Sequence, residues 1–182
     1  IGASGIPGLF TKAVIKGMHA QCAMPIIFPL SNPSRLVEAQ PAQVMEWTQG
    51  KAIVATGSPF GSVEYDGRQF EISQCNHSYI FPGIGLGVIS AKASRITDEM
   101  LMVASMTLAE LVPESSDPTV GILPPLTALT DISKKIAFAV GRVAQAEGGA
   151  LQTSEEELLG HIERNFWLPE YREYRRVAMR AR

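Results

Sequence analysis

Two short apolar segments, each followed by a turn of small polar residues and proline, constrain the fold of this chain most strongly. The first is "IIFPLSNPS" (residues 26–34) and the second is "IVATGSPF" (residues 53–60). Both apolar runs are continuous rather than alternating, as in parallel strands that are covered on both faces. A helix that begins at Pro41 is predicted between them, since proline suits a first helical turn. The pattern predicts a right-handed βαβ crossover within a parallel sheet.

The remaining chain predicts helices interrupted by one hairpin. "VEYDGRQFEI" alternates around Asp66-Gly67, a strong hairpin signal. Helices are predicted over residues 11–20, 83–94, 97–111, 131–147 and 154–165, with a proline-rich loop over 112–130. The first has an apolar face of Leu9, Val14, Ile15 and Met18. Gly85 and Gly87 would each cost a helix about 1 kcal/mol relative to alanine. We therefore expect a ligand or a packed helix to approach their backbone closely.

Together these elements predict an α/β fold. A Rossmann-type, mostly parallel sheet with flanking helices is assigned to residues 1–150, and a helical C-terminal tail to residues 151–182. The opening "IGASGIPG" has the pattern of a strand that ends in a turn, so we expect the chain to be the C-terminal part of a longer protein. The arginine-rich end, from Arg172 onward, is interpreted as a solvated helix.

Composition excludes several classes of partner. A net charge of -2 argues against nucleic acid or an anionic membrane as the main partner. No segment approaches the roughly 20 apolar residues that a membrane-spanning helix needs. Cys22 and Cys75 are too few for a disulfide framework, which favours a reducing, cytoplasmic setting.

Asn32 is the sharpest candidate for a binding residue. Asparagine in a turn often bonds its own backbone, and that purely structural role stays open here. Asn32, however, follows a buried strand, and Pro33 fixes the exit of the chain. Open α/β sheets bind ligands at the carboxyl ends of their strands, so we expect Asn32 to point into a ligand cleft.

A second candidate, Asn76, lies in the polar patch 73–78, between the hairpin and an apolar helix. Neighbouring His77 has no second ligand at metal-binding spacing, and a catalytic role for it is not favoured. The opening glycines have the spacing GxxGxxG, which fits a tight turn into a helix as well as a turn at the edge of a cofactor. Taken alone, the residues supply no convincing nucleophile, acid–base pair or metal cluster.

Several blocks in this order resemble one family. "IIFPLSNPS", "GSPF", "QCNHSYIFPGIGLGV" and "RITDEML" are similar to segments of the malic enzymes, and the tail "NFWLPEYREYRR" resembles the bacterial, NAD-linked type. The resemblance covers essentially all 182 residues. It implies oxidation of L-malate by hydride transfer to NAD, followed by decarboxylation to pyruvate and carbon dioxide. It also implies a Mg²⁺ or Mn²⁺ ion as Lewis acid.

The same resemblance implies roles for particular residues. It assigns Asn32 and Asn76 to the malate and nicotinamide site. It places the opening turn beside the cofactor, through Gly2, Ala3, Ser4 and Gly5. The family's lysine base, its tyrosine acid and its metal ligands, one Glu and two Asp, are expected upstream of Ile1. His77 stands where many members have a second asparagine, so its role is open.

We therefore expect part of an NAD-dependent malic enzyme, a homo-oligomer whose N-terminal portion completes the active site, so that this piece alone is inactive. Two alternatives stay open. One is a different NAD(P)-dependent dehydrogenase, and the other is a non-catalytic binding or assembly module whose apolar helices pack against another domain or subunit.

Overall fold

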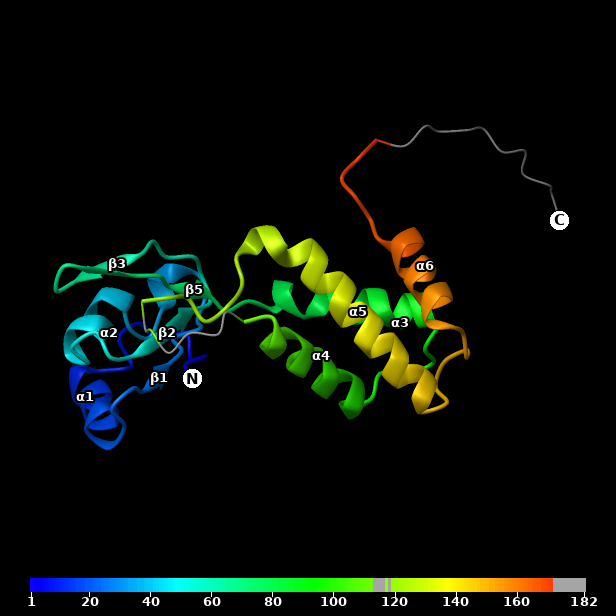
Figure 1. Cartoon of the computed structure of the whole chain (residues 1–182). Helices are drawn as coiled ribbons and strands as arrows, with labels where there is room; N and C mark the ends of the chain where they lie inside the picture. Colours follow the sequence, from blue (N-terminus) through cyan, green and yellow to red (C-terminus); the bar gives the residue numbers. More distant parts are fainter. Residues whose placement is uncertain (113–116, 118, 172–182) are drawn as a thin grey trace.

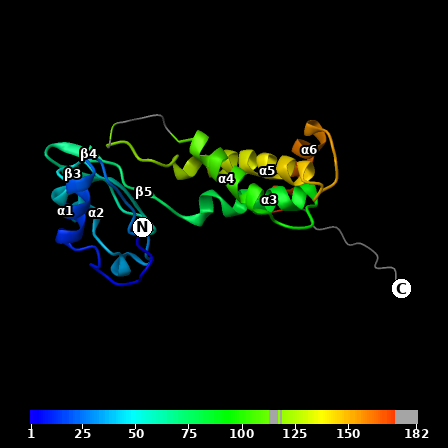
Figure 2. The same cartoon turned by 90° about the horizontal axis from the view of Figure 1, so that it is seen from below.

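The computed structural model describes residues 1–112, 117 and 119–171. An α/β part, built around a small parallel sheet, is followed by a group of helices (Figure 1). The two parts lie end to end, and the same arrangement is seen from below (Figure 2). Each part has its own cluster of buried apolar side chains.

The sheet has the strand order β1-β2-β5 and is parallel throughout. Its strands are β1 (Ile26–Ile27), β2 (Ile53–Thr56) and β5 (Ser73–Gln74). Gly2 extends this arrangement, because it forms a parallel bridge with Pro29 just beyond β1. The bridge consists of Gly2 N–H donating to Phe28 O (2.7 Å) and Leu30 N–H donating to Gly2 O (2.8 Å). The predicted parallel pairing of the two apolar segments is confirmed.

Helices α1 (Lys12–Gln21) and α2 (Pro41–Trp47) begin where the sequence predicts. The side chain of Thr11 caps α1 by accepting a hydrogen bond from Val14 N–H, and Pro41 occupies the first turn of α2. The core of this part contains side chains from both helices, the sheet and the hairpin, among them Ile15, Ile27, Val44, Met45, Val54 and Phe70.

The expectation that β1 is covered on both faces is wrong, and the apolar face of α1 is largely uncovered. Of the predicted apolar face of α1, only Ile15 is buried, while Leu9, Val14 and Met18 are exposed. Ile26 is also 58% exposed, so β1 is not covered on both faces. Successive strand residues point to opposite faces. Ile27 therefore reaches the core, whereas no element of the described chain covers Ile26.

The hairpin forms as predicted, from β3 (Val63–Tyr65) and β4 (Arg68–Phe70). Asp66 and Gly67, at its tip, both have positive φ angles, of 51° and 71°. A two-residue turn of this kind matches the twist of the flanking strands. Phe70, at the end of β4, is 1% exposed and fixes the hairpin against the core.

The helical part contains α3 (Phe81–Ala91), α4 (Asp98–Glu110), α5 (Leu129–Ala146) and α6 (Glu155–Asn165), with short 3-10 turns at His77–Tyr79 and Leu126–Ala128. A further 3-10 turn, Ser34–Leu36, lies in the α/β part between β1 and α2. Thr97 caps α4, and Ser154 with Glu157 forms a capping box at α6, both as predicted. The observed helix ends differ from the predicted ends by a few residues, most at α3, which begins and ends earlier than expected.

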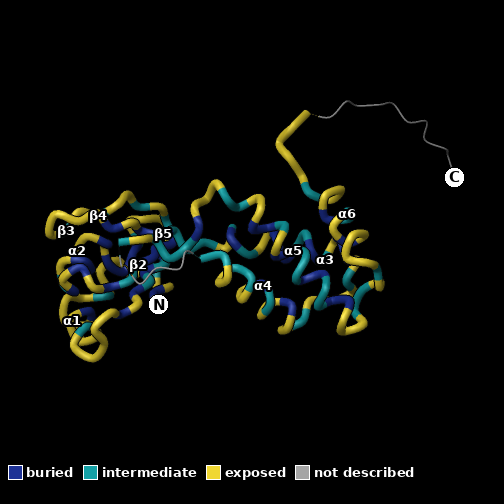
Figure 3. Tube along the Cα trace, viewed as in Figure 1, coloured by how far each residue is buried: buried dark blue, intermediate teal, exposed yellow. Residues whose placement is uncertain are grey.

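One of the two glycines expected to have a close neighbour does so. A β-carbon on Gly87 would lie 2.7 Å from Ala137 O on α5, so a packed helix explains this glycine. At Gly85 a β-carbon would meet nothing within 4 Å, so no packed helix explains this glycine, and the alternative of a ligand stays a prediction. Buried residues lie along α3 and α5 where the two helices run together (Figure 3).

Within the predicted C-terminal tail, α6 is helical, and the residues after it, up to Tyr171, are not. The arginine-rich end from Arg172 onward lies outside the described residues. The division of the chain at residue 150 stays a prediction; in the structure the last strand ends at Gln74 and helices follow. Across the described ranges, the helices are all too short or too polar to cross a membrane.

Candidate functional site

Four turns come together at one edge of the sheet. Asn32 follows β1, the Gly57–Ser58 turn follows β2, Asn76 follows β5, and the opening turn 2–5 follows the bridge to Pro29. The strands are parallel, so their carboxyl ends share an edge, which is where open α/β sheets bind ligands. Hydrogen bonds connect Asn32 to the turn after β2 and connect that turn to β5.

Asn32 is exposed, and its Oδ1 atom accepts a hydrogen bond from Ser58 Oγ at 2.5 Å. The peptide bond between Asn32 and Pro33 is cis. A second hydrogen bond holds Ser58, because Thr56 Oγ1 donates to its carbonyl oxygen at 2.8 Å. The side chain of Asn32 is therefore fixed by the neighbouring turn and not by its own backbone.

Gly57 allows the two turns to meet. A β-carbon at this position would lie 2.1 Å from Leu30 O and 2.9 Å from Asn32 Nδ2, far inside contact distance. The carbonyl oxygen of Gly57 accepts a hydrogen bond from Gln74 Nε2 at 3.1 Å, and Cys75 N–H donates to Thr56 O at 2.8 Å. These bonds connect the turn after β2 to the end of β5.

Asn76 has a local structural role as well. Its Oδ1 atom accepts a hydrogen bond from Ser78 N–H at 3.0 Å and so caps the 3-10 turn that begins at His77. A backbone N–H can only donate, so this bond fixes the orientation of the amide, with its NH₂ group turned away from the turn. Within the described part of the chain, the Nδ2 atoms of Asn32 and Asn76 donate no hydrogen bond. Both are thus available as neutral donors to oxygen atoms of a ligand.

The other polar side chains near β5 offer little chemistry. Burial raises the pKa of the Cys75 thiol, which keeps it protonated at neutral pH. Burial, with a smaller contribution from Cys75, also raises the pKa of Tyr79, and its hydroxyl donates to Pro124 O at 2.5 Å. His77 is exposed at the start of the 3-10 turn. In the described ranges, no three His, Cys, Asp or Glu side chains are grouped so that they could hold a metal ion.

The structure adds a residue that the sequence did not single out, Glu38. This carboxylate is fully buried and accepts hydrogen bonds from the backbone N–H groups and the hydroxyls of both Ser4 and Ser31. Burial alone would raise its pKa, but the bonds to Ser31 and Ser4 outweigh that effect and lower the pKa to about 2. Glu38 lies in a loop without helical or strand periodicity, so nothing in the sequence marks it as buried.

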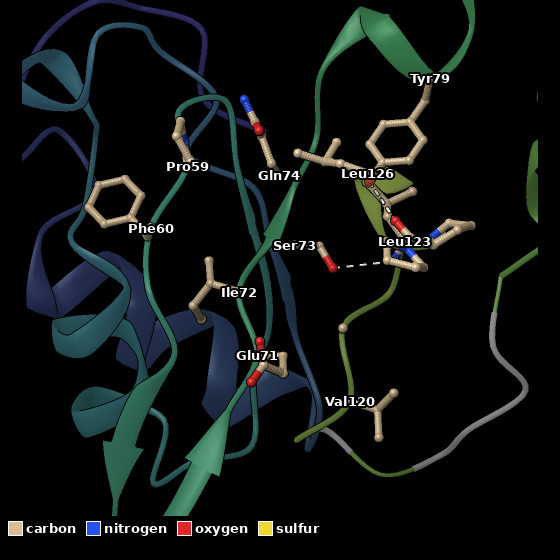
Figure 4. A pocket seen from close by; sticks show the side chains of 13 residues that line it. Pro59, Phe60, Glu71, Ile72, Ser73, Gln74, Tyr79, Val120, Leu123 and Leu126 are labelled. Carbon is tan, nitrogen blue, oxygen red and sulfur yellow. Dashed lines mark hydrogen bonds between the residues drawn. The ribbon is translucent and has the colours of Figure 1, made fainter. Parts of the chain in front are cut away.

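A separate cavity of about 410 Å³ lies beside β5. Ile72 and Ser73 line one side of the cavity, and the segment 120–126 lines the other (Figure 4). The Ser73 hydroxyl accepts a hydrogen bond from Leu123 N–H at 3.2 Å, which connects the two sides. Its lining includes neither Asn32 nor Asn76. It does include Gln74, the last residue of β5, so the cavity borders the carboxyl edge of the sheet without containing either amide.

A parallel sheet with polar turns at its carboxyl edge is typical of the open α/β proteins that bind ligands such as nucleotides there. Residues 1–145 match the family described as "Malic enzyme, NAD binding domain". The chain therefore belongs to the malic enzyme family and contains sequence of that family's NAD-binding domain.

Relatives and solved structures agree with this assignment. The chain is 58% identical to the NAD-dependent malic enzyme of Colwellia psychrerythraea over 98% of its own length and 32% of that protein. It is 60% identical to the NAD-dependent malic enzyme of Pseudomonas savastanoi pv. phaseolicola over 97% of the chain and 31% of that protein. The malic enzymes of Pyrococcus horikoshii and Entamoeba histolytica have similar structures, and each match covers 87% of this chain with 29% sequence identity. The TM-score is 0.63 for the Pyrococcus enzyme, of which 32% is covered, and 0.68 for the Entamoeba enzyme, of which 29% is covered. The chain thus spans about a third of the length of these relatives.

Proposed function

We propose that this chain is part of an NAD-dependent malic enzyme, which converts L-malate and NAD⁺ into pyruvate, carbon dioxide and NADH. The names of the relatives that match nearly the whole chain support this proposal. The structural feature that supports it is the pair of neutral amides, Asn32 and Asn76, whose NH₂ groups are available at the carboxyl edge of the sheet.

In this proposal the chain binds and orients, and the remainder of the protein supplies the reacting groups. Bound NAD⁺ would supply the acceptor for the hydride from C2 of malate. Amide NH₂ groups can donate hydrogen bonds to malate carboxylate or nicotinamide carboxamide oxygens without adding charge. Such fixed geometry lowers a barrier by replacing a random encounter with a positioned one. The opening turn, Gly2 to Gly5, would lie beside the cofactor.

The proposal assigns the lysine base, the tyrosine acid and the carboxylate ligands of Mg²⁺ or Mn²⁺ to the part of the protein outside this chain. The 182-residue chain by itself is accordingly expected to form no NADH from malate.

We also propose that the full-length protein is a cytoplasmic homo-oligomer. The free thiols of Cys22 and Cys75 support a reducing compartment, and exposed apolar side chains such as Phe81 and Trp167 support further packing partners.

The test is the substitution Asn32→Ala in the full-length enzyme. Loss of a hydrogen bond to a charged ligand costs about 1.5–3 kcal/mol, so kcat/KM for malate should fall about ten- to a hundredfold. Gln69→Ala is the matched control, because it removes an exposed amide from β4 in the hairpin.

Malate-dependent formation of NADH and of carbon dioxide should be measured together. An unchanged kcat/KM in the Asn32→Ala enzyme would remove this residue from the site. NADH formation without carbon dioxide would instead support a different NAD(P)-dependent dehydrogenase.

A further inference from the structure

The buried carboxylate of Glu38 connects two separate turns of the candidate site. Its Oε1 atom accepts hydrogen bonds from Ser4 N–H (2.8 Å), from Ser4 Oγ (2.9 Å) and from Ser31 Oγ (2.5 Å). Its Oε2 atom accepts a longer bond from Ser31 N–H (3.3 Å). Ser4 belongs to the opening turn, and Ser31 directly precedes Asn32.

A further hydrogen bond links the two turns through the same hydroxyl. Ser31 Oγ donates to Glu38 and accepts from Gly5 N–H at 2.9 Å. Gly2 completes the arrangement, because a β-carbon there would lie 2.7 Å from Cδ of Glu38. The backbone of the opening turn therefore lies directly against the carboxylate.

Packing does not fix the opening turn. Ala3, Ser4 and Ile6 are exposed, and so are Pro7 and Gly8. Residues 2–5 are held by the bridge of Gly2 to the strand and by polar bonds that lead to Glu38 and Ser31, while Gly8 N–H, further along, donates to Val37 O at 3.3 Å. The opposite is true of Glu38, which is 0% exposed and lies between buried Val37 and Ala39. A firmly held carboxylate thus organises an otherwise exposed turn.

We propose that Glu38 is a positioning residue that sets the opening turn 2–5 and the Ser31–Asn32 turn in register for ligand binding. It acts through Ser4 and Ser31 and does not itself reach the ligand, since its side chain is buried. This inference rests on the proposed function, which assigns both turns to the cofactor and substrate site. Charge matters in this role, because a carboxylate only accepts hydrogen bonds and all four groups around it are donors.

The experiment compares two variants of the full-length enzyme. Glu38→Gln preserves the shape of the side chain and replaces one acceptor oxygen with a donor. Thr48→Val is the matched control, because Thr48 is also 0% exposed and its hydroxyl bonds to Val44 O and to Ala52 N–H, before the amino end of β2. Both variants remove buried polar contacts, but only Glu38→Gln affects the two turns.

Two quantities should be measured on each variant: KM for NAD⁺ alongside kcat, and hydrogen exchange of peptides covering residues 1–8 and 29–38. For Glu38→Gln we expect KM for NAD⁺ to rise at least fivefold and exchange in both peptides to accelerate. For Thr48→Val we expect a lower thermal midpoint with KM within twofold of the wild-type value and no change in those peptides. Should Glu38→Gln fail to fold, Ser31→Ala removes one linking hydroxyl and should show the same effects at smaller size.

Equal changes in KM for the Glu38→Gln and Thr48→Val enzymes would overturn the proposal, since they would reflect general destabilisation. Unchanged exchange in both peptides, or faster exchange with an unchanged KM, would overturn it as well. The Asn32→Ala enzyme tells separately whether the proposed function fails. A loss of activity there, with no response to Glu38→Gln, would retain the function and reject only the role of Glu38.

Discussion

The substitution Gly57→Ala tests how closely the turns at the carboxyl edge approach one another. The added methyl carbon would lie 2.1 Å from Leu30 O, whereas β-carbons essentially never come nearer than 3.0 Å to another heavy atom. The backbone must therefore shift by about 1 Å, the difference between those two distances. Leu30 cannot yield easily, because its N–H donates to Gly2 O at 2.8 Å.

Overpacking a well-packed site costs typically 1–3 kcal/mol, and a clash with backbone belongs at the upper end, about 3 kcal/mol. The same methyl carbon would lie 2.9 Å from Asn32 Nδ2, so the shift also displaces the candidate binding amide. We expect the thermal unfolding midpoint of the full-length enzyme to fall, and kcat/KM for malate to fall with it.

Gly61→Ala is the control for this experiment. Gly61 lies in the same connection between β2 and β3, is exposed, and a β-carbon there would meet nothing within 4 Å. Thermal unfolding and malate-dependent NADH formation should match the wild type in that variant. Equal behaviour of the Gly57→Ala and Gly61→Ala enzymes would refute the close approach of the two turns.

Two further predictions concern helix packing and acid stability. Gly87→Ala should lower the free energy of unfolding by about 1–3 kcal/mol, because the methyl group meets α5. Gly85→Ala should raise it by up to about 1 kcal/mol, because its surroundings are open. Denaturant titration of both variants measures the difference, and a change of the same sign in both would contradict the packing. The folded-state pKa of Glu38, about 2, lies below its ordinary value of 4.5, so the unfolded chain binds this proton first as the pH falls. The stability that ionised Glu38 contributes is therefore fully present above about pH 4.5 and is lost as the pH falls from there towards 2. The difference in thermal midpoint between the wild type and Glu38→Gln should shrink over that interval, and a constant difference would show that ionisation of Glu38 does not contribute.

Local signals predicted much of the secondary structure. Thr11, Thr97 and Ser154 start helices because their side chains accept hydrogen bonds from backbone N–H groups within the first turn. Asp66-Gly67 forms the hairpin because both residues tolerate positive φ angles. These interactions involve residues close in sequence, so the pattern of residue types is sufficient to recognise them.

Burial was harder to predict, because it depends on what else packs nearby. Periodicity gave α1 an apolar face, but Val14 and Met18 remain exposed and Ile15 alone is buried. A helix pattern shows which residues share a face. It does not show whether the described chain supplies a surface to cover that face.

The sequence by itself determined the first two parallel strands, the capped helices, the hairpin and the choice of Asn32 and Asn76 as candidates, but it did not predict β5, the strand that Asn76 follows. Only the tertiary structure decided that Gly57 brings the Asn32 turn against its neighbour and that Glu38 joins the opening turn to Ser31. The physical reason is range. A cap or a hairpin turn is completed within a few residues, whereas Ser4 and Glu38 are separated by 34 positions, and a buried carboxylate is recognisable only once its donors surround it.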